Sequence, residues 1–389
     1  MISTKNLKFF NFKKKISSSV VKKELRLILS DKENQVINSL KLSYKYSYSN
    51  KFLNKFKNKF SSIRLIGMGG SILGTKAIYS FLNSQIKKKI FFFDNLLPLL
   101  KKEKKSNFLN IIISKSGNTL ETISNTNNIV KKSQRNIFIT ENSNNYLRNL
   151  ANQLKAEIVD HNNFIGGRYS VLSEVGMLPC SLIGLKSNKF KQFNSLIKKK
   201  GFIDSLVSNV ANILYFIKKK KNNSIILNYD ENSDDLFKWY QQLVGESLGK
   251  KQKGIFPFIS TMPKDNHSLM QLYLDGPQKN FFTFFGVSEK KSNKIINSTI
   301  LETFNFIKNK KFSQILDSQR IATQKVFNNM NIPFRSFEIK RRNEETLGEL
   351  FTFFILETIL LGKCLKINPY DQPAVELIKK STKKTLLNF

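Results

Sequence analysis

The sequence predicts an α/β fold of two domains, each with a parallel sheet flanked by helices. First, the chain has 389 residues, and a single hydrophobic core stops growing at about 250–300 residues. Second, short β-branched apolar runs alternate with amphipathic segments, which is typical of parallel sheets covered on both faces. Third, this alternation occurs twice, with a boundary between residues 180 and 201. No Pro-rich or Gly/Ser-rich linker separates the two sets, so we expect the domains to pack firmly together.

The predicted elements divide the chain into four parts. Residues 1–59 form an N-terminal helical segment, with helical patterns at 24–29 and 51–60. Residues 60–190 form the first domain, with strands at 63–67, 89–94, 109–114 and 136–140 and helices at 71–82, 119–131 and 145–154. Residues 191–345 form the second domain, with helices between strands at 224–229, 255–260, 281–287 and 333–339. Residues 346–389 form C-terminal helices.

The formal net charge is +37, from 65 basic and 28 acidic residues. The lysines are scattered in short runs, such as 13–15, 198–200 and 218–221, among many Asn, Ile and Phe residues. All of these have A/T-rich codons, so we interpret the runs as solvated faces that reflect codon drift. A nucleic-acid-binding protein is the alternative, and it would bind with a steep salt dependence. The lysine runs carry no interleaved aromatic residues, which disfavours that alternative.

Two cysteines, Cys180 and Cys364, lie in apolar surroundings without CxxC spacing or clustered histidines. They are expected to be buried thiols in a reducing compartment, which favours a cytoplasmic protein without a metal site. No uncharged apolar run reaches the about 18 residues that a membrane-spanning helix needs. Residues 1–21 are basic and lack acidic residues, which faintly resembles a transit peptide, but a Lys-rich first helix explains them better.

Residues 110–122 predict a loop that binds a phosphate. An apolar strand ends at Ile113 and a helix begins after Thr119, with small and polar residues between them. Ser114, Ser116 and Thr119 offer hydroxyls and Lys115 offers a cation, while the N–H groups of the following helix point to the same place. No Gly-Lys-Ser/Thr sequence closes the loop, so a phosphorylated small molecule fits better than a nucleoside triphosphate. The alternative is a Ser/Thr-rich turn that only caps the helix.

A glycine-rich turn at 67–74 also follows a strand and opens a helix. Its spacing departs from the dinucleotide-binding fingerprint, and Asp94 is the nearest candidate for a ribose-binding acid. A nucleotide site is therefore the weaker interpretation. A tight turn at Gly70 that presents backbone N–H groups and the Ser71 hydroxyl to a small polar ligand fits better.

Two further segments contain charged residues among small ones. In residues 166–170, Gly167 lets the chain approach a ligand and Arg168 supplies a rigid cationic fork suited to an oxyanion. In residues 241–250, Glu246 lies among small residues on a helix expected to begin near Asp234, which suits a general base. The alternatives are a surface ion pair for Arg168 and a solvated helix-end carboxylate for Glu246.

The remaining candidates are His267, one of the two histidines, and a C-terminal segment. His267 is followed by Ser268, and His161 lies in a polar run. In residues 368–376, Pro373 is expected at a helix start, which would fix Gln372 at the helix mouth and place Lys379 two turns along the helix.

Together these segments resemble the glucose-6-phosphate isomerase family. The matching blocks occur in family order: the glycine turn at 66–74, the Ser-Lys loop at 114–122, Gly-Gly-Arg-Tyr-Ser at 166–170, Glu-Ser-x-Gly-Lys at 246–250, His-Ser-x-x-Gln at 267–271 and Asp-Gln-Pro-x-Val-Glu at 371–376. Each block alone is a weak signal, whereas their joint occurrence is specific.

The resemblance implies two sugar-isomerase (SIS) domains in a homodimer, with C-terminal helices that complete the active site. The implied reaction interconverts glucose 6-phosphate and fructose 6-phosphate, in glycolysis and gluconeogenesis, without a metal or an organic cofactor. By resemblance, the phosphate is held by Ser114, Lys115, Ser116 and Thr119, and the sugar is positioned by Gly70, Ser71, Gly167 and Gln372. Glu246 moves the proton, Arg168 stabilises the enediolate, and His267 and Lys379 assist ring opening, with His267 supplied across the dimer interface.

Proton transfer between adjacent carbons through an enediolate requires the same residue types. One carboxylate can receive a proton from one carbon and deliver it to the next, and a fixed cation beside the developing oxyanion is worth about 3–4 kcal/mol. Two alternatives stay open: a related phosphosugar isomerase that also accepts mannose 6-phosphate, and a non-catalytic sugar-phosphate sensor. The sensor would keep residues 114–119 but would need neither Glu246 nor His267.

Overall fold

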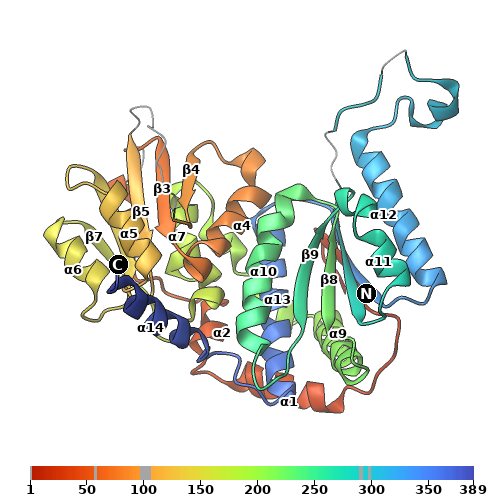
Figure 1. Cartoon of the computed structure of the whole chain (residues 1–389), viewed down its shortest axis with the longest axis horizontal. Coiled ribbons are helices and arrows are strands. Elements are labelled where there is room, and N and C mark those ends of the chain that lie inside the picture. Colours follow the sequence, from red (N-terminus) through yellow and green to blue (C-terminus); the bar gives the residue numbers. More distant parts are fainter. Residues whose placement is uncertain (1, 57–58, 97–106, 289–291, 297–298) are drawn as a thin grey trace.

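The computed structural model describes residues 2–56, 59–96, 107–288, 292–296 and 299–389. It has two sheets that lie side by side, each flanked by helices (Figure 1). The first sheet has five parallel strands in the order β4 (Lys89–Phe93), β3 (Ser62–Gly67), β5 (Phe108–Ile113), β6 (Arg135–Thr140) and β7 (Glu157–Asp160). The predicted α/β class is therefore confirmed.

The central strand of this sheet, β5, is buried at all six positions, which explains its continuous apolar run. Successive side chains point to opposite faces. Ile111 and Ile113 join the main core, whereas Ile112 packs with β6 residue Phe138 in a smaller cluster. The helices of this domain are α4 (Leu73–Phe81), α5 (Leu120–Ile129), α6 (Tyr146–Gln153) and α7 (Glu174–Leu182).

The second sheet has six strands in the order β1 (Ile2–Ser3), β2 (Leu7–Phe10), β11 (Phe334–Ile339), β10 (Asn280–Val287), β8 (Asn223–Asn228) and β9 (Phe256–Thr261). The last four are parallel to one another, and β2 pairs antiparallel with β11. The helices beside it are α8 (Phe193–Ile197), α9 (Lys200–Lys218), α11 (Met270–Asp275) and α12 (Phe312–Asn329).

The N-terminal segment is only partly helical. It contains α1 (Ser19–Ser30), α2 (Gln35–Ser39) and α3 (Asn50–Phe56), close to the helical patterns expected there, and residues 57–58 lie outside the described residues. Residues 2–10, however, form β1 and β2, because Leu7 and Phe9 bury one face of a short strand against the second sheet. The expectation of helices alone was wrong at this point.

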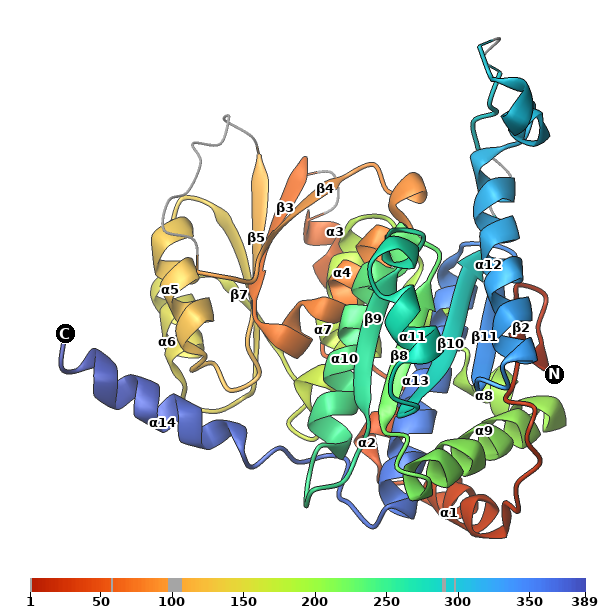
Figure 2. The same ribbon diagram turned by 45° about the vertical axis from the view of Figure 1, so that its right-hand side comes forward.

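Two helices join the halves of the molecule. Helix α10 (Asp234–Leu248) packs against α4 of the first domain and against α13 (Glu344–Cys364), as Figure 2 also shows. Helix α13 is buried from Thr346 to Gly362. One hydrophobic cluster extends over both sheets, from Ile63 to Phe285 and Phe337. Among the described residues, no helix combines the length and the apolarity that crossing a bilayer requires.

A buried ion pair fastens the second sheet to α13. Arg335 on β11 pairs with Glu357 on α13, and their side chains are 0% and 2% exposed. Arg335 also donates to Asn209 Oδ1 on α9 at 2.9 Å, and the Tyr240 hydroxyl on α10 donates to Glu357 Oε1 at 2.9 Å. The cluster therefore links β11 with three helices.

We predict that Glu357→Gln lowers the free energy of unfolding by about 3 kcal/mol, because it leaves a buried guanidinium without its counter-charge. The exposed Glu302 supplies the control, since Glu302→Gln should change that free energy by no more than about 0.5 kcal/mol. Urea unfolding of both variants measures the difference. Equal stabilities of the two variants would contradict the assignment.

Candidate active site

A cavity of about 440 Å³ opens at the carboxyl ends of the first sheet's strands. Turns that follow β3, β5 and β6 form one side, and α10 and the C-terminal segment form the other. Its lining residues are Met68, Gly70, Ser71, Lys115, Ser116, Thr119, Glu141, Gly166, Gly167, Arg168, Gln242, Glu246, Tyr370, Asp371, Gln372 and Lys379. Ligands of open parallel sheets bind at this edge.

The predicted phosphate loop follows β5 and presents Lys115, Ser116 and Thr119 to the cavity. Ser114 is buried beneath them, and its Oγ lies 2.9 Å from Thr119 Oγ1. Gly117 adopts φ +65°, and a Cβ at this position would lie 1.8 Å from Asn145 Oδ1, so only glycine fits the turn. Because α5 begins directly after Thr119, its N-terminal N–H groups also favour an anion here.

Sequence reasoning missed Glu141, which lies opposite this loop. Its carboxylate pairs with Lys115 Nζ at 3.3 Å, and its backbone N–H donates to the Lys115 carbonyl at 3.0 Å. A usable signal was present, since Glu141 directly follows the predicted strand at 136–140. The carboxyl end of that strand reaches the same edge of the sheet as the phosphate loop.

The glycine turn after β3 forms a 3-10 turn, η1 (Gly69–Ser71), that packs against a second one, η3 (Gly167–Leu172). A Cβ on Gly70 would lie 2.1 Å from the carbonyl carbon of Gly167 and 2.4 Å from the backbone nitrogen of Arg168. The two backbones are therefore in direct contact. This contact sets the position of Ser71 and Arg168 on the cavity wall.

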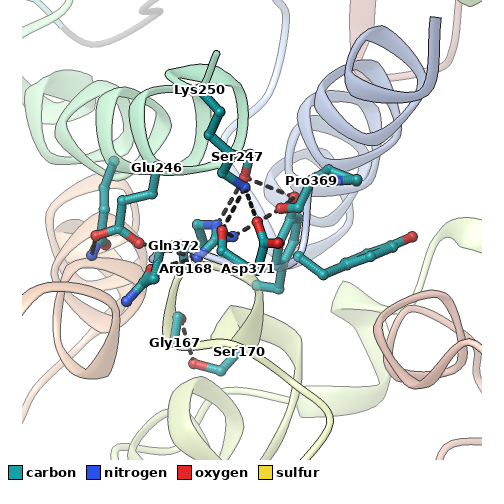
Figure 3. Close-up of polar contacts among 12 residues, drawn as sticks. Gly167, Arg168, Ser170, Glu246, Ser247, Lys250, Pro369, Asp371 and Gln372 are labelled. Carbon is teal, nitrogen blue, oxygen red and sulfur yellow. Dashed lines mark hydrogen bonds and ion pairs between the residues drawn. The ribbon is translucent and has the colours of Figure 1, made fainter. Parts of the chain in front are cut away.

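Arg168 is 2% exposed, and its guanidinium donates five hydrogen bonds that join three segments of the chain (Figure 3). Its acceptors are Ser247 Oγ at 2.8 Å, Glu246 Oε2 at 3.2 Å, Gln372 Oε1 at 2.6 Å, the Pro369 carbonyl at 2.8 Å and the Asp371 carbonyl at 3.0 Å. An arginine has five N–H donors, so all of them have partners. The cation is held in one orientation at the cavity wall.

Side chains around Arg168 support this arrangement. The Tyr169 hydroxyl donates to the Pro369 carbonyl at 3.0 Å and lies 2.8 Å from Ser247 Oγ, and burial raises the pKa of Tyr169 to about 12. Lys250 donates to Asp371 Oδ1 at 2.6 Å. This hydrogen bond lowers the pKa of Asp371. The C-terminal segment is thereby tied to the end of α10.

Glu246 projects from α10, which begins at Asp234 as expected. One carboxylate oxygen accepts from Arg168, and the other accepts from Gln242 Nε2 at 2.9 Å, one turn earlier on the helix. The side chain is 27% exposed, so it reaches the cavity while its orientation is fixed. Leu243 and Val244, on the same helix, are buried.

The C-terminal candidates also lie at this cavity. Gln372 accepts from Arg168, and Lys379 lines the cavity from α14 (Val375–Leu386). The helix begins two residues after Pro373, so the expectation that Pro373 opens it was wrong. The arginine hydrogen bond, instead of a helix mouth, holds Gln372.

The two histidines lie outside the cavity lining. His267 is exposed at the end of the 3-10 turn η6 (Lys264–His267). His161 is buried, and burial lowers its pKa to about 4, so its imidazole is neutral at physiological pH. Among the described residues, no group of three or more His, Cys, Asp or Glu side chains could hold a metal ion.

Fold and cavity together define a two-domain α/β protein whose site suits a small phosphorylated molecule beside a carboxylate and a fixed guanidinium. Comparison with known families narrows this class. The model of the family described as phosphoglucose isomerase matches residues 30–262. The chain belongs to this family.

Relatives of known sequence agree with this assignment. A glucose-6-phosphate isomerase from Methanocaldococcus jannaschii is 34% identical over 82% of this chain and 82% of its own length. A glucose-6-phosphate isomerase from Mycoplasmopsis pulmonis is 31% identical over 83% of this chain and 82% of its own length.

Solved structures show the same fold. A hypothetical protein from Thermus thermophilus superposes with a TM-score of 0.82 at 22% identity, covering 94% of both chains. A glucose-6-phosphate isomerase from Chlamydia trachomatis superposes with a TM-score of 0.70 at 19% identity, covering 97% of this chain and 80% of its own. The arrangement of two helix-flanked sheets is therefore shared across divergent sequences.

We predict that Gly70→Ala lowers the free energy of unfolding by about 1–3 kcal/mol, because its methyl group would force η1 away from η3. A Cβ on Gly201, in contrast, would point into open space, with no contact within 4 Å. Gly201→Ala is therefore the matched control, and it should leave stability unchanged or raise it by up to about 1 kcal/mol. Urea unfolding measures both, and an undisturbed Gly70→Ala variant would disprove the close contact.

Proposed function

We propose that this protein interconverts glucose 6-phosphate and fructose 6-phosphate through an enediolate, without a metal or an organic cofactor. One observation carries the proposal: Glu246 Oε2 lies 3.2 Å from Arg168 Nη1 in a cavity that also receives Lys115, Ser116 and Thr119. Family membership and the names of the relatives support it. The expected setting is glycolysis and gluconeogenesis in the cytoplasm.

The phosphate end of the substrate would bind at the loop after β5. Ser116 and Thr119 offer hydroxyls and Lys115 a cation, all on the cavity wall. Ser114 contributes indirectly, because its hydrogen bond orients the Thr119 hydroxyl. Binding energy from this remote group can hold the open sugar chain in reactive geometry.

The proton transfer would take place at the opposite end. The Glu246 carboxylate removes the proton from C2 of the open-chain aldose and returns it to C1, while the hydroxyl proton on O2 moves to O1. Negative charge develops on the enediolate oxygens beside Arg168, whose five hydrogen bonds prevent it from moving away. Such a pre-oriented cation stabilises the transition state more than a mobile one could.

Substrate positioning and ring opening would use the remaining residues. The cavity is also lined by Ser71, Gly70, Gly167 and Gln372, which would position the sugar. Lys379 enters from α14 and would assist ring opening. His267 is exposed outside this cavity, which suits a residue that a partner subunit contributes in a homodimer.

A coupled assay on purified protein tests this proposal. Fructose 6-phosphate should be converted to glucose 6-phosphate, and a five-carbon sugar-acid phosphate that mimics the enediolate should inhibit competitively. The same assay run for mannose 6-phosphate determines whether the second aldose is also formed. Binding of sugar phosphate without turnover would identify a sensor and refute the isomerase proposal.

We predict that Glu246→Gln lowers kcat at least about 100-fold while substrate binding is largely kept, because the amide cannot accept the proton. Glu141→Gln is the matched control, since it alters a carboxylate of the same cavity at the phosphate end. Steady-state kinetics of both variants distinguish the roles. Normal turnover by Glu246→Gln would show that Glu246 is not the catalytic base.

Lys115→Ala should mainly raise KM, by about tenfold or more, because it removes a charged contact made equally in the ground and transition states. The exposed Lys198 lies outside the cavity lining and serves as the control. Lys198→Ala should leave both constants unchanged. A loss confined to kcat in Lys115→Ala would contradict a phosphate-binding role.

The composite site can be tested by complementation. His267→Ala and Glu246→Gln should each be nearly inactive as homodimers. After the two are unfolded together and refolded, heterodimers carry one intact site, so the mixture should regain about a quarter of wild-type activity. No recovery, with heterodimers demonstrated by mass spectrometry, would place His267 outside its partner's site.

A further inference from the structure

A second cavity, of about 700 Å³, lies in the second domain. Its lining residues are Phe12, Lys13, Lys14, Tyr215, Phe216, Lys219, Lys221, Asn328, Asn331, Ile332, Pro333 and Phe334. They come from the loop after β2, the end of α9 and the turn between α12 and β11. None of them lines the candidate active site. In Figure 2 the N-terminal segment runs beside α9, on the side of the molecule away from α14.

The floor of this cavity is apolar and aromatic. Phe12, Phe216 and Ile332 are buried, and Phe334 is half-buried. The rings of Phe12 and Phe216 pack edge to face with centroids 4.9 Å apart, which fixes them. A flat ring laid on an aromatic surface gains about 1–3 kcal/mol from stacking, so the floor suits an aromatic ligand.

The rim is basic. Lys13, Lys14, Lys219 and Lys221 line the cavity, and no acidic side chain is among its described lining residues. Lys14 Nζ donates to the Tyr215 hydroxyl at 2.6 Å and lies 4.0 Å from the centre of its ring. Several like charges around one cavity repel one another. An anion bound among them would relieve that repulsion.

Two amide side chains, Asn328 and Asn331, complete the rim. An amide offers both a donor and an acceptor, and asparagine can pair in this way with the edge of a purine base. A fatty acid or a simple aromatic acid could use only the donor side of such an amide, through its carboxylate. The three chemistries of the cavity therefore point to a base attached to a phosphate.

Lysines alone would not support this conclusion, because the chain carries a net charge of +37. A smaller cavity of about 260 Å³ illustrates the difference. It is also basic, but its lining includes Glu157 and one aromatic residue, Phe56. Both cavities are lined by two amide side chains, so the larger one is distinguished by its aromatic floor and by the absence of a carboxylate among its described lining residues.

We propose that this second cavity binds a nucleoside phosphate, with the base on the aromatic floor and the phosphate at the lysine rim. Its volume lies within the about 300–1,000 Å³ typical of small-molecule sites. A nucleic-acid strand would instead need an extended groove that follows the backbone. The proposal adds a ligand site separate from the sugar-phosphate site.

The test is a fluorescence titration of the full-length chain with N-methylanthraniloyl ADP, in the presence of saturating fructose 6-phosphate. We expect saturable binding of one nucleotide per chain. The double variant Lys14→Ala/Lys219→Ala should weaken it at least about tenfold, a loss of about 1.4 kcal/mol. Phe334→Leu, which keeps apolar volume but removes the ring, should weaken it about threefold or more.

The matched control is Lys189→Ala/Lys198→Ala, which removes the same charge from two exposed lysines outside this cavity. It should bind like the wild type, both lysine variants should keep the wild-type unfolding midpoint, and all variants should keep the wild-type isomerase activity. Absence of saturable binding, or an equal loss in the control, would overturn the proposal. So would tighter binding when fructose 6-phosphate is left out, equal competition by inorganic pyrophosphate, or tighter binding of single-stranded oligothymidylate.

Discussion

The guanidinium of Arg168 is the interaction on which the rest of the site depends. It is buried, and a buried charge is costly unless it is paired and hydrogen-bonded. Its five acceptors come from α10 and the C-terminal segment, whereas Arg168 itself follows the first sheet. Satisfying this one cation therefore brings three distant parts of the chain to the same cavity.

The glycine contact between η1 and η3 and the tie between Lys250 and Asp371 serve the same end. The first presses the Arg168 backbone against the turn that carries Ser71, and the second holds the segment that carries Gln372. Lys379 enters the cavity beyond that segment. The site is thus built by backbone contacts and buried hydrogen bonds that connect both domains. The shared hydrophobic core holds the two domains in a fixed relative position.

Local patterns predicted much of this molecule. The apolar run of β5 followed by small and polar residues predicted a strand and a loop, which the structure places at the cavity, and the small residues around Glu246 predicted a carboxylate at a cavity. Long-range features could not be predicted from the sequence. The pairing of β2 with β11 joins residues more than 300 positions apart, and the four-residue strand carries too little alternation to reveal its partner. Glu141 was missed because its ion pair with Lys115 forms only in the folded chain. The second cavity was missed because the two lysine runs that line it come together only after folding.

The proposed function requires that a single substrate reaches from the loop after β5 to the Glu246–Arg168 pair. A crystal structure with a five-carbon sugar-acid phosphate tests this claim most directly. We predict that its phosphate contacts Lys115, Ser116 and Thr119 while its acid group lies beside Glu246 and Arg168. A phosphate bound at Arg168, or a ligand held in another cavity, would contradict the account.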